Sequence, residues 1–356
     1  MLAVPLAAAA QSTPPTRNPD LLARKGAAAL EHQRFGDALA VLTEASTMLP
    51  RDPSVCFGAG IAAFMLGQND AARSWFERAL ALEPTYVAPA QWLGELHYRA
   101  GRLREAIAVY ETALQRSPNA KKLTERLFEW RKESDLENRF SETRGPHFTV
   151  LFERPADEPI ARHVVEQLEA AYTHVVEALD AYPPQPITAV LYTTEQFRDI
   201  TRLAEWTAAG YDGRIRVPLD SVIEGQAHLD GLLIHEVVHA LVATLGGRTV
   251  PTWVNEGLAT ALEPGGIEDA ETTLSQTDVR PELSRLHRSF VGLSASEAEV
   301  AYAYSARAVQ RLIELRGTPA LVALLQDLGR GAQFSNAFQQ HFGMRYEDFP
   351  ALVARD

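Results

Sequence analysis

The sequence predicts two parts: an α-helical solenoid of three repeats, then an α+β domain that combines a small mixed sheet with a helical half. Three observations carry this prediction. Residues recur at intervals of 34 over the first third of the chain. Gly145-Pro146 then breaks the chain, and strand-like and helical segments follow. Two histidines four residues apart, in an apolar helix of the second part, indicate a metal site.

The composition is that of a folded protein without a general nucleic-acid surface. Of the 356 residues, 46% are hydrophobic and 22% charged, which predicts real cores rather than disorder. The net charge of −12 disfavours nucleic acid as a partner, because such binders need a basic face. The single cysteine, Cys56, excludes an intrachain disulfide and a multi-cysteine metal site. Any metal must therefore be held by His, Asp or Glu.

Residues 1–17 are expected to be a signal segment or a disordered tail. Leu2–Ala10 is a short apolar run, and Ala8 and Ala10 form the small-residue pattern that precedes a cleavage point at Gln11. No Lys or Arg precedes the run. We expect an exported protein, periplasmic or secreted; the alternative is an Ala-rich disordered tail on a cytoplasmic protein. No later segment is expected to be long and apolar enough to span a membrane, so no integral membrane segment is predicted.

Residues 18–120 are predicted to form three repeats of two helices each. Small residues at fixed positions let the two helices approach closely, large residues fill the space beside them, and proline ends the second helix. The matching columns are Gly26, Gly60 and Gly94; Ala38, Ala72 and Ala106; Leu42, Phe76 and Tyr110; Ala45, Ala79 and Ala113; and Pro50, Pro84 and Pro118.

This pattern resembles the tetratricopeptide repeat (TPR) family, most clearly in the third unit with Trp92-Leu93-Gly94. The resemblance implies a solenoid whose concave face often binds peptides, so a protein partner in that groove is one expectation. The alternative is that the repeats only extend or dimerise the protein. Residues 121–145 are predicted to be a capping helix and linker, as solenoid ends require. The charges of Lys121–Arg139 are expected to be a solvated helix face.

Residues 146–356 are predicted to be the α+β domain. Apolar and β-branched runs predict its strands, and apolar residues at helical spacing predict its helices. The expected elements are strands at His147–Phe152, Ile187–Tyr192 and Arg214–Pro218, helices at Pro159–Asp180 and Thr194–Ala204, a turn at Gly210–Gly213, and helices after about His228.

The stretch His235-Glu236-Val237-Val238-His239 is the most informative in the chain. Residues four apart on a helix differ by about 40° around its axis, so His235 and His239 project from one face and can grip one metal ion. Glu236 is placed beside them as a base acting on a metal-activated water. A catalytic site needs a third ligand and one open position. Glu256, 17 residues after His239 on a second predicted helix, can supply that ligand after a turn through Gly246-Gly247.

Together with Trp253-Val254-Asn255-Glu256-Gly257-Leu258-Ala259, this motif is similar to the gluzincin metallopeptidases, and more closely to a bacterial peptidase MA-like domain related to thermolysin and the aminopeptidases. The resemblance implies a zinc peptidase with one Zn²⁺ per chain and a peptide or protein substrate. It also implies that an edge strand near Gly210–Val217 pairs with extended substrate.

Further site residues are carried over from the same resemblance. A tyrosine at the start of a later helix would stabilise the developing oxyanion, and Tyr302 is favoured over Tyr304 for that role. Independently of the resemblance, each ligand histidine is expected to have an acid behind it; Glu263 is one candidate, and Asp230 is another that can equally be a charge at a helix terminus. The Gly-x-Met-Glu-Asn segment that holds a free amine in the aminopeptidases is missing, and Glu224 is a weak substitute. Endopeptidase and exopeptidase action therefore both stay open.

Two other functions compete with the peptidase. In one, the repeats make the chain a TPR binding or scaffold protein with a catalytically silent peptidase-like domain. In the other, the same metal site hydrolyses a non-peptide amide or an ester. The intact Glu236 favours an active site over a silent one, because a structural metal site does not need this acid. The lone histidines His228, His287 and His341 are assigned no function.

Overall fold

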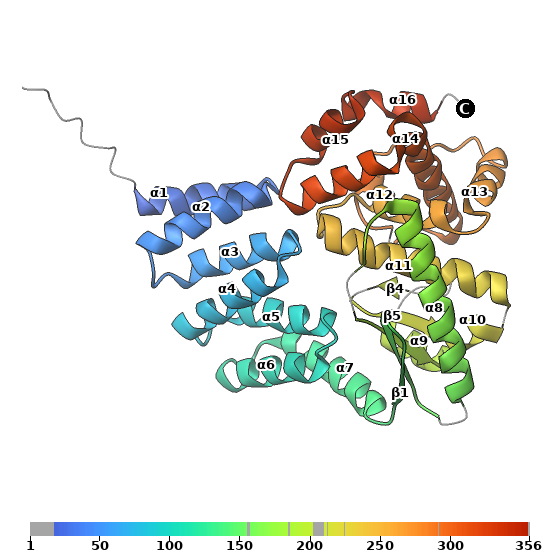
Figure 1. The fold of residues 1–356 in the computed structure, drawn as a ribbon. Coiled ribbons are helices and arrows are strands. Elements are labelled where there is room, and N and C mark those ends of the chain that lie inside the picture. Colours follow the sequence, from blue (N-terminus) through green and yellow to red (C-terminus); the bar gives the residue numbers. More distant parts are fainter. Residues whose placement is uncertain are drawn as a thin grey trace, which may run out of the picture.

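The computed structural model describes residues 18–154, 157–183, 186–201, 210–211, 213–223, 225–290 and 292–354. The chain forms two parts lying side by side, an array of helix pairs and a second domain with a sheet (Figure 1). The expected signal segment, residues 1–17, lies outside the described residues, and so does Glu224.

Three helix pairs and one further helix make up the array. Asn18 and Asp52 begin α1 and α3 by accepting hydrogen bonds from backbone N–H groups of the first turn, and each is followed by proline. Each repeat packs its small residue on its own large one: a side chain on Gly60 would begin 2.5 Å from the Phe76 ring. The helices are α1 (Pro19–Glu31), α2 (Phe35–Met48), α3 (Pro53–Met65), α4 (Asn69–Leu82), α5 (Val87–Arg99), α6 (Leu103–Arg116) and α7 (Lys121–Glu137).

Helix α7 covers the end of the array. Its apolar residues Leu123, Leu127 and Trp130 are buried, and the Trp130 ring lies 4.4 Å from the ring of Tyr110 in the last repeat. The expectation that all charges of this helix are solvated was wrong for Glu133, which is 3% exposed. It pairs with arginine from the second domain, because that domain covers this face of α7.

The second domain begins with a five-stranded sheet in the order β1-β2-β3-β5-β4. The central strands run parallel, while β1 and β4 pair antiparallel at the two edges. The strands are β1 (Ser141–Arg144), β2 (Phe148–Phe152), β3 (Ile187–Tyr192), β4 (Gly210–Tyr211) and β5 (Ile215–Pro218). Two details differ from expectation: β1 lies in the range expected to be linker, and Gly210–Tyr211 is a short edge strand rather than only a turn.

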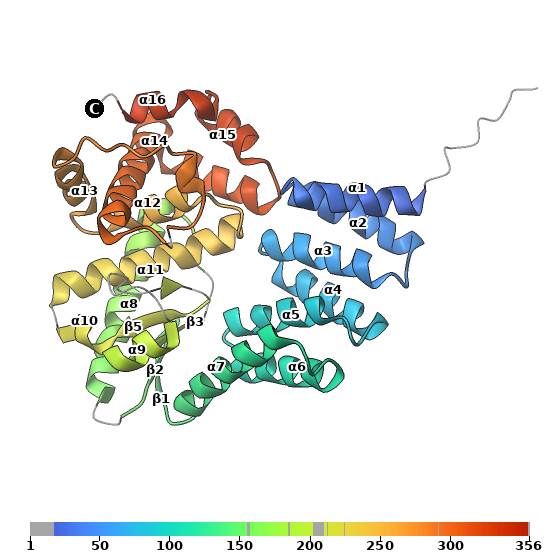
Figure 2. The ribbon, with the colours of Figure 1, turned by 180° about the vertical axis from the view of Figure 1, so that it is seen from behind.

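Helices cover the sheet and build the rest of the domain (Figures 1 and 2). One hydrophobic core runs from the strands through α11, α12 and α14 to the C-terminal helices. A break at Gly317 divides α14 into two helical segments. The helices are α8 (Glu158–Leu179), α9 (Thr194–Thr201), α10 (Leu219–Ile223), α11 (Gln226–Gly246), α12 (Thr252–Leu262), α13 (Gly266–Ser275), α14 (Ala295–Gly329), α15 (Phe334–Phe342) and α16 (Pro350–Val353).

Helix α11 corrects one expectation about membranes. Its stretch Leu229–Gly246 is long and apolar enough, by length and composition, to span a bilayer, whereas no such segment was expected after the N-terminus. The composition has another physical cause: 61% of this stretch is buried inside the protein. A helix surrounded by core needs apolar residues on nearly all sides.

Candidate metal centre

Helix α11 presents two histidines side by side. The rings of His235 and His239 are 4.6 Å apart and nearly perpendicular, as one helical turn between them predicts. Around them, Leu233, Val237 and Val238 are fully buried, so the helix is held firmly in the core. The side chains of the histidines are 18% and 11% exposed, which leaves a narrow opening to solvent.

Helix α12 brings Glu256 to the same point. Among the described residues, His235, His239 and Glu256 are the group of three whose ligand atoms lie within 4.8 Å of one another. The chain turns back after α11 at Gly247, which has a positive φ of 66°, and α12 starts at Thr252. As expected, the residues between His239 and Glu256 form the end of α11, a turn and the start of α12.

The distances from the Glu256 carboxylate to the two rings fit those between ligands of a tetrahedral metal ion. Glu256 Oε2 lies 3.4 Å from His235 Nε2 and 3.3 Å from His239 Nε2, both longer than an ordinary N–H···O hydrogen bond. Ligands bound tetrahedrally to zinc are separated by about 3.3–3.5 Å from one another. Two imidazoles and one carboxylate leave a fourth position open for solvent or substrate.

A second layer of contacts fixes both rings. Glu263 Oε1 lies 2.6 Å from His235 Nδ1, and Asn255 Oδ1 lies 3.1 Å from His239 Nδ1. Each contact engages the nitrogen that faces away from Glu256, which leaves Nε2 free to act as the ligand atom. Glu263 was expected in this role, although it lies just after α12 in an extended conformation rather than on its face. Asn255 was missed, because nothing marks the residue before a ligand as its support.

The electrostatics of the site are those of a tightly coupled group. Burial disfavours the charged form of His235, but the nearby carboxylates of Glu256 and Glu263 outweigh burial and raise the pKa of His235 to about 10. Burial likewise lowers the pKa of His239, but the charge of Glu256 outweighs burial, so the pKa of His239 is raised. The pKa of Glu256 falls well below its usual range, because the two imidazoles overcome its burial. The carboxylate and the two rings are therefore held together before any ion binds.

Glu236 and Tyr302 lie at the edge of this group. Glu236 follows His235 on α11 and is 2% exposed. The ring of Tyr302, on α14, lies 6.4 Å from the ring of His235. Burial raises the pKa of Tyr302, and the charges of Glu256, Glu236 and Glu263 raise it further, so the hydroxyl keeps its proton and can donate it in a hydrogen bond.

Tyr304, the other candidate for the same role, has different surroundings. It is 3% exposed in the core, and the charged groups that act on its pKa are Arg280 and Arg307, not the residues of the metal cluster. Tyr302 is thus the tyrosine that the fold brings to the cluster. Tyr302 is brought to the cluster because its helix, α14, packs closely on α12. At this contact a side chain on Gly257 would begin 2.3 Å from the Ser305 carbonyl oxygen, so only glycine fits.

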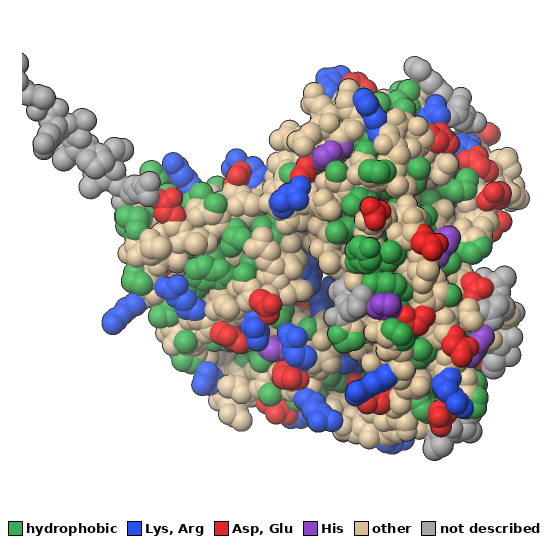
Figure 3. All heavy atoms as spheres, viewed as in Figure 1, with side chains coloured by type: hydrophobic (Ala, Val, Ile, Leu, Met, Phe, Trp, Pro, Cys, Tyr) green, Lys and Arg blue, Asp and Glu red, His purple; other side chains and the backbone are tan. Residues whose placement is uncertain are grey.

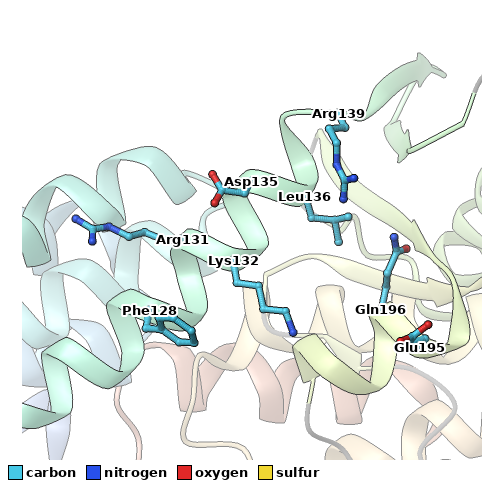
Figure 4. Close-up of a pocket in the computed structure, with 8 residues that line it drawn as sticks. All are labelled: Phe128, Arg131, Lys132, Asp135, Leu136, Arg139, Glu195 and Gln196. Carbon is cyan, nitrogen blue, oxygen red and sulfur yellow. The ribbon is translucent and has the colours of Figure 1, made fainter.

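A cavity of about 690 Å³ lies between α7 and α9, outside the metal cluster (Figure 4). It is separate from the metal cluster, and two of its cations are already paired: Arg131 with Glu111 at 2.7 Å and Arg139 with Glu153 at 3.2 Å. We therefore assign it no ligand. Its lining residues are Phe128, Arg131, Lys132, Asp135, Leu136, Arg139, Glu195 and Gln196.

Family models agree with both parts of the chain. The model of the Peptidase MA superfamily matches residues 171–351, which include α11, α12 and α14. Two tetratricopeptide repeat models match residues 24–87 and 63–127. These matches cover the helix pairs and the metal cluster described above.

Individual proteins match the repeats. Tetratricopeptide repeat protein 7B of Homo sapiens is 36% identical over 84 residues, which are 22% of this chain and 10% of that protein. This chain therefore spans about a tenth of the length of that curated relative.

Two solved structures match the same region. The first TPR of Spaghetti (RPAP3) bound to HSP90 peptide SRMEEVD is 22% identical, with a TM-score of 0.32, over 34% of this chain and 98% of its own. The Sgt2 TPR domain from Aspergillus fumigatus is also 22% identical, with a TM-score of 0.33, over 37% of this chain and 88% of its own.

Proposed function

This chain belongs to the Peptidase MA superfamily and carries tetratricopeptide repeats, and on that premise we propose that it is a zinc-dependent peptidase. One observation carries the proposal: the ligand atoms of His235, His239 and Glu256 converge within 4.8 Å of one another, with Glu256 3.3–3.4 Å from each ring nitrogen. Two imidazoles with one carboxylate form the donor set of a zinc hydrolase. One zinc ion per chain is the expected cofactor.

Zinc, Glu236 and Tyr302 each have a separate role in the proposed reaction. Bound zinc supplies Lewis acidity, which polarises a carbonyl group and lowers the pKa of water. Glu236, buried next to the ligand His235, takes a proton from the attacking water and later gives it to the leaving amine. Tyr302 donates its hydroxyl proton in a hydrogen bond to the oxygen on which negative charge develops.

The sheet edge supports an extended peptide as the substrate. Strand β4 is the last strand of the sheet, and one of its sides has no strand neighbour among the described residues. An extended peptide can add to such an edge through backbone hydrogen bonds, which recognise a chain without demanding particular side chains. This mode is open to an endopeptidase as well as to an exopeptidase.

Replacement of Glu236 tests this mechanism against a silent scaffold. We expect Glu236→Gln to keep zinc and to lose cleavage by at least about a hundredfold, since general acid–base catalysis contributes that much. The matched control is Glu166→Gln, which removes an exposed carboxylate on α8. Cleavage of a broad peptide library, with and without chelator, is followed by mass spectrometry. A parent protein that binds zinc and cleaves nothing favours the TPR scaffold, and a variant that cleaves like the parent excludes Glu236 as the base.

The repeats are proposed to bring a protein partner or substrate to the peptidase. The proposal rests on the TPR family match, since such arrays present an extended inner surface. Crosslinking of the intact protein with candidate peptides, followed by mapping of the crosslinked residues, tests it. Crosslinks confined to the second domain would exclude the array as a binding surface.

Export of the protein is proposed from the apolar run Leu2–Ala10 and the small residues before Gln11. N-terminal sequencing of the protein recovered from cell fractions tests this. A protein in the exported fraction that starts at Gln11 is expected, and an intact N-terminus in the cytoplasm would contradict export.

A further inference from the structure

The turn between the two helices of each repeat meets the second domain (Figures 1 and 2). At each meeting point the second domain supplies a glycine with positive φ, and the backbones approach so closely that no side chain would fit there. A Cβ would begin 1.4 Å from the Arg99 carbonyl oxygen at Gly213, 2.7 Å from the Leu66 carbonyl carbon at Gly247, and 2.6 Å from the Gly36 Cα at Gly331.

These glycines border the elements that build the candidate site. Gly247 directly follows α11, which carries His235 and His239. Gly213 precedes β5, the neighbour of the edge strand, and Gly331 follows α14, which carries Tyr302. On the face that Figure 3 shows, a hollow with Lys or Arg side chains in it lies between the two parts. The array therefore contacts the second domain through close backbone approaches at Gly213, Gly247 and Gly331.

A buried ion pair joins the array to β5. The Arg216 side chain is 4% exposed, as is that of Glu133 on α7. Arg216 Nη2 donates to Glu133 Oε1 at 3.2 Å and to the Tyr98 hydroxyl at 2.8 Å. The Tyr98 hydroxyl in turn donates to Glu133 Oε2 at 2.8 Å, which closes a buried triangle of three side chains. Removing Arg216 or Glu133 would leave the opposite buried charge without this partner, and removing the Tyr98 hydroxyl would take one hydrogen bond from each.

A second arginine of the same strand end strengthens this contact. Arg214, also 4% exposed, forms an ion pair with Glu137 of α7. Its Nη2 also donates to the Gly101 carbonyl oxygen at 2.9 Å, within the turn of the third repeat. Arg214 directly precedes β5 and Arg216 lies on it, and both reach α7, so the start of β5 is fixed to the array by two arginines.

The fixed strand is the one that supports the edge. Arg216 lies opposite Gly210 of β4 in the antiparallel pair, and β4 has only the two residues Gly210 and Tyr211. A strand so short has little stability of its own and depends on its neighbour. Contacts that fix β5 therefore also fix β4, the edge strand with which an extended substrate would pair.

We propose that the repeat array is a fixed brace of the peptidase site, in which Tyr98 and Glu133 hold Arg216 and thereby position the substrate-pairing edge. This inference rests on the proposed function for the meaning of that edge. Tyr98, Glu133 and Arg216 are positioning residues, because they act through β5 and touch neither the metal cluster nor the reacting bond. The array contributes to substrate binding even where no partner occupies its groove.

The test compares two tyrosines of the same array in the full-length zinc protein. Tyr98→Phe removes the hydroxyl of the triangle but keeps the ring that stacks 5.1 Å from Trp130. Tyr110→Phe is the matched control, since its hydroxyl donates only within the array, to the Gln91 carbonyl oxygen at 3.2 Å. Measurements are kcat and KM on one cleaved peptide, zinc content, and hydrogen exchange of the β5 amides.

For Tyr98→Phe we expect KM and the β5 exchange rate to rise on the order of tenfold, as the loss of a hydrogen bond to charged groups produces. The kcat should change less than twofold to threefold, because the metal cluster lies on α11 and α12. Tyr110→Phe should change neither KM nor exchange. Equal KM values for the two variants in a cleaving protein would overturn the brace. If the parent cleaves no peptide, the proposed function fails. Hydrogen exchange then tests the brace by itself, and equal β5 exchange rates in the two variants would show that the array does not fix β5.

Discussion

The carboxylate behind His235 gives the sharpest quantitative test of the metal centre. Glu263→Gln keeps the size of the side chain and removes the charge that faces His235 Nδ1 across 2.6 Å. A hydrogen bond to a charged group contributes about 1.5–3 kcal/mol, which corresponds to roughly a tenfold to hundredfold change in an equilibrium constant. The two side chains are 18% and 29% exposed, so solvent screening favours the lower end. We expect zinc affinity to fall about tenfold to thirtyfold.

The contact behind the other histidine predicts a smaller effect. Asn255 Oδ1 lies 3.1 Å from His239 Nδ1, and the amide is neutral. Loss of a neutral hydrogen bond costs about 0.5–1.5 kcal/mol, so Asn255→Ala should weaken zinc binding about twofold to tenfold. The ranking of the two variants is thus set by charge and distance, before any measurement.

Competition with a chromophoric zinc chelator measures both affinities at one pH. The matched control is Glu268→Gln, an exposed carboxylate in the first turn of α13 that lies outside the cluster. The reasoning is refuted if Glu263→Gln binds zinc within twofold of the parent protein, or if Asn255→Ala weakens binding more than Glu263→Gln does.

Two further predictions concern the oxyanion donor and the brace. Tyr302→Phe should lower kcat about a hundredfold with zinc content unchanged, as loss of an oxyanion donor does, whereas Tyr304→Phe should keep most activity; the reverse order would exchange their roles. Burial raises the pKa of Glu137. The positive charge of Arg214 lowers it and the negative charge of Glu133 raises it, and the net shift is upward. The folded protein then binds this proton more tightly than the unfolded chain, so the stability contributed by Glu137 grows as pH falls through the raised pKa towards its ordinary value. The free energy of unfolding of the parent, relative to Glu137→Gln, should therefore increase in chemical unfolding as the pH falls from neutrality towards the ordinary carboxyl pKa, and a decrease would contradict the sign.

The repeats and the metal cluster could be predicted because periodic spacing determines them. Gly26, Gly60 and Gly94 recur at one interval and pack on the large residues of their own repeats in the structure. His235 and His239 share a helix, so the distance between them follows from helix geometry alone. The position of Glu256 needed only a turn between two helices.

The brace could not be predicted, because its residues carry no local signal. Arg214 and Arg216 alternate with Ile215 and Val217, a pattern typical of a strand with one solvated face. Glu133 and Glu137 lie in a highly charged helix, where solvation is the ordinary expectation. Only the packing of α7 against β5 turns these charges into buried pairs. Strand β1 was not predicted for a similar reason. Its sequence, Ser-Glu-Thr-Arg, is polar, and polar residues suit an edge strand as well as a linker.

The zinc content of the purified protein, measured by elemental analysis, tests the central claim most directly. The account predicts close to one zinc ion per chain in the parent and in Glu236→Gln, and a loss of the metal in His239→Ala. A parent protein that retains no zinc after exposure to it, or a His239→Ala variant that retains as much as the parent, would contradict the metal centre built from His235, His239 and Glu256.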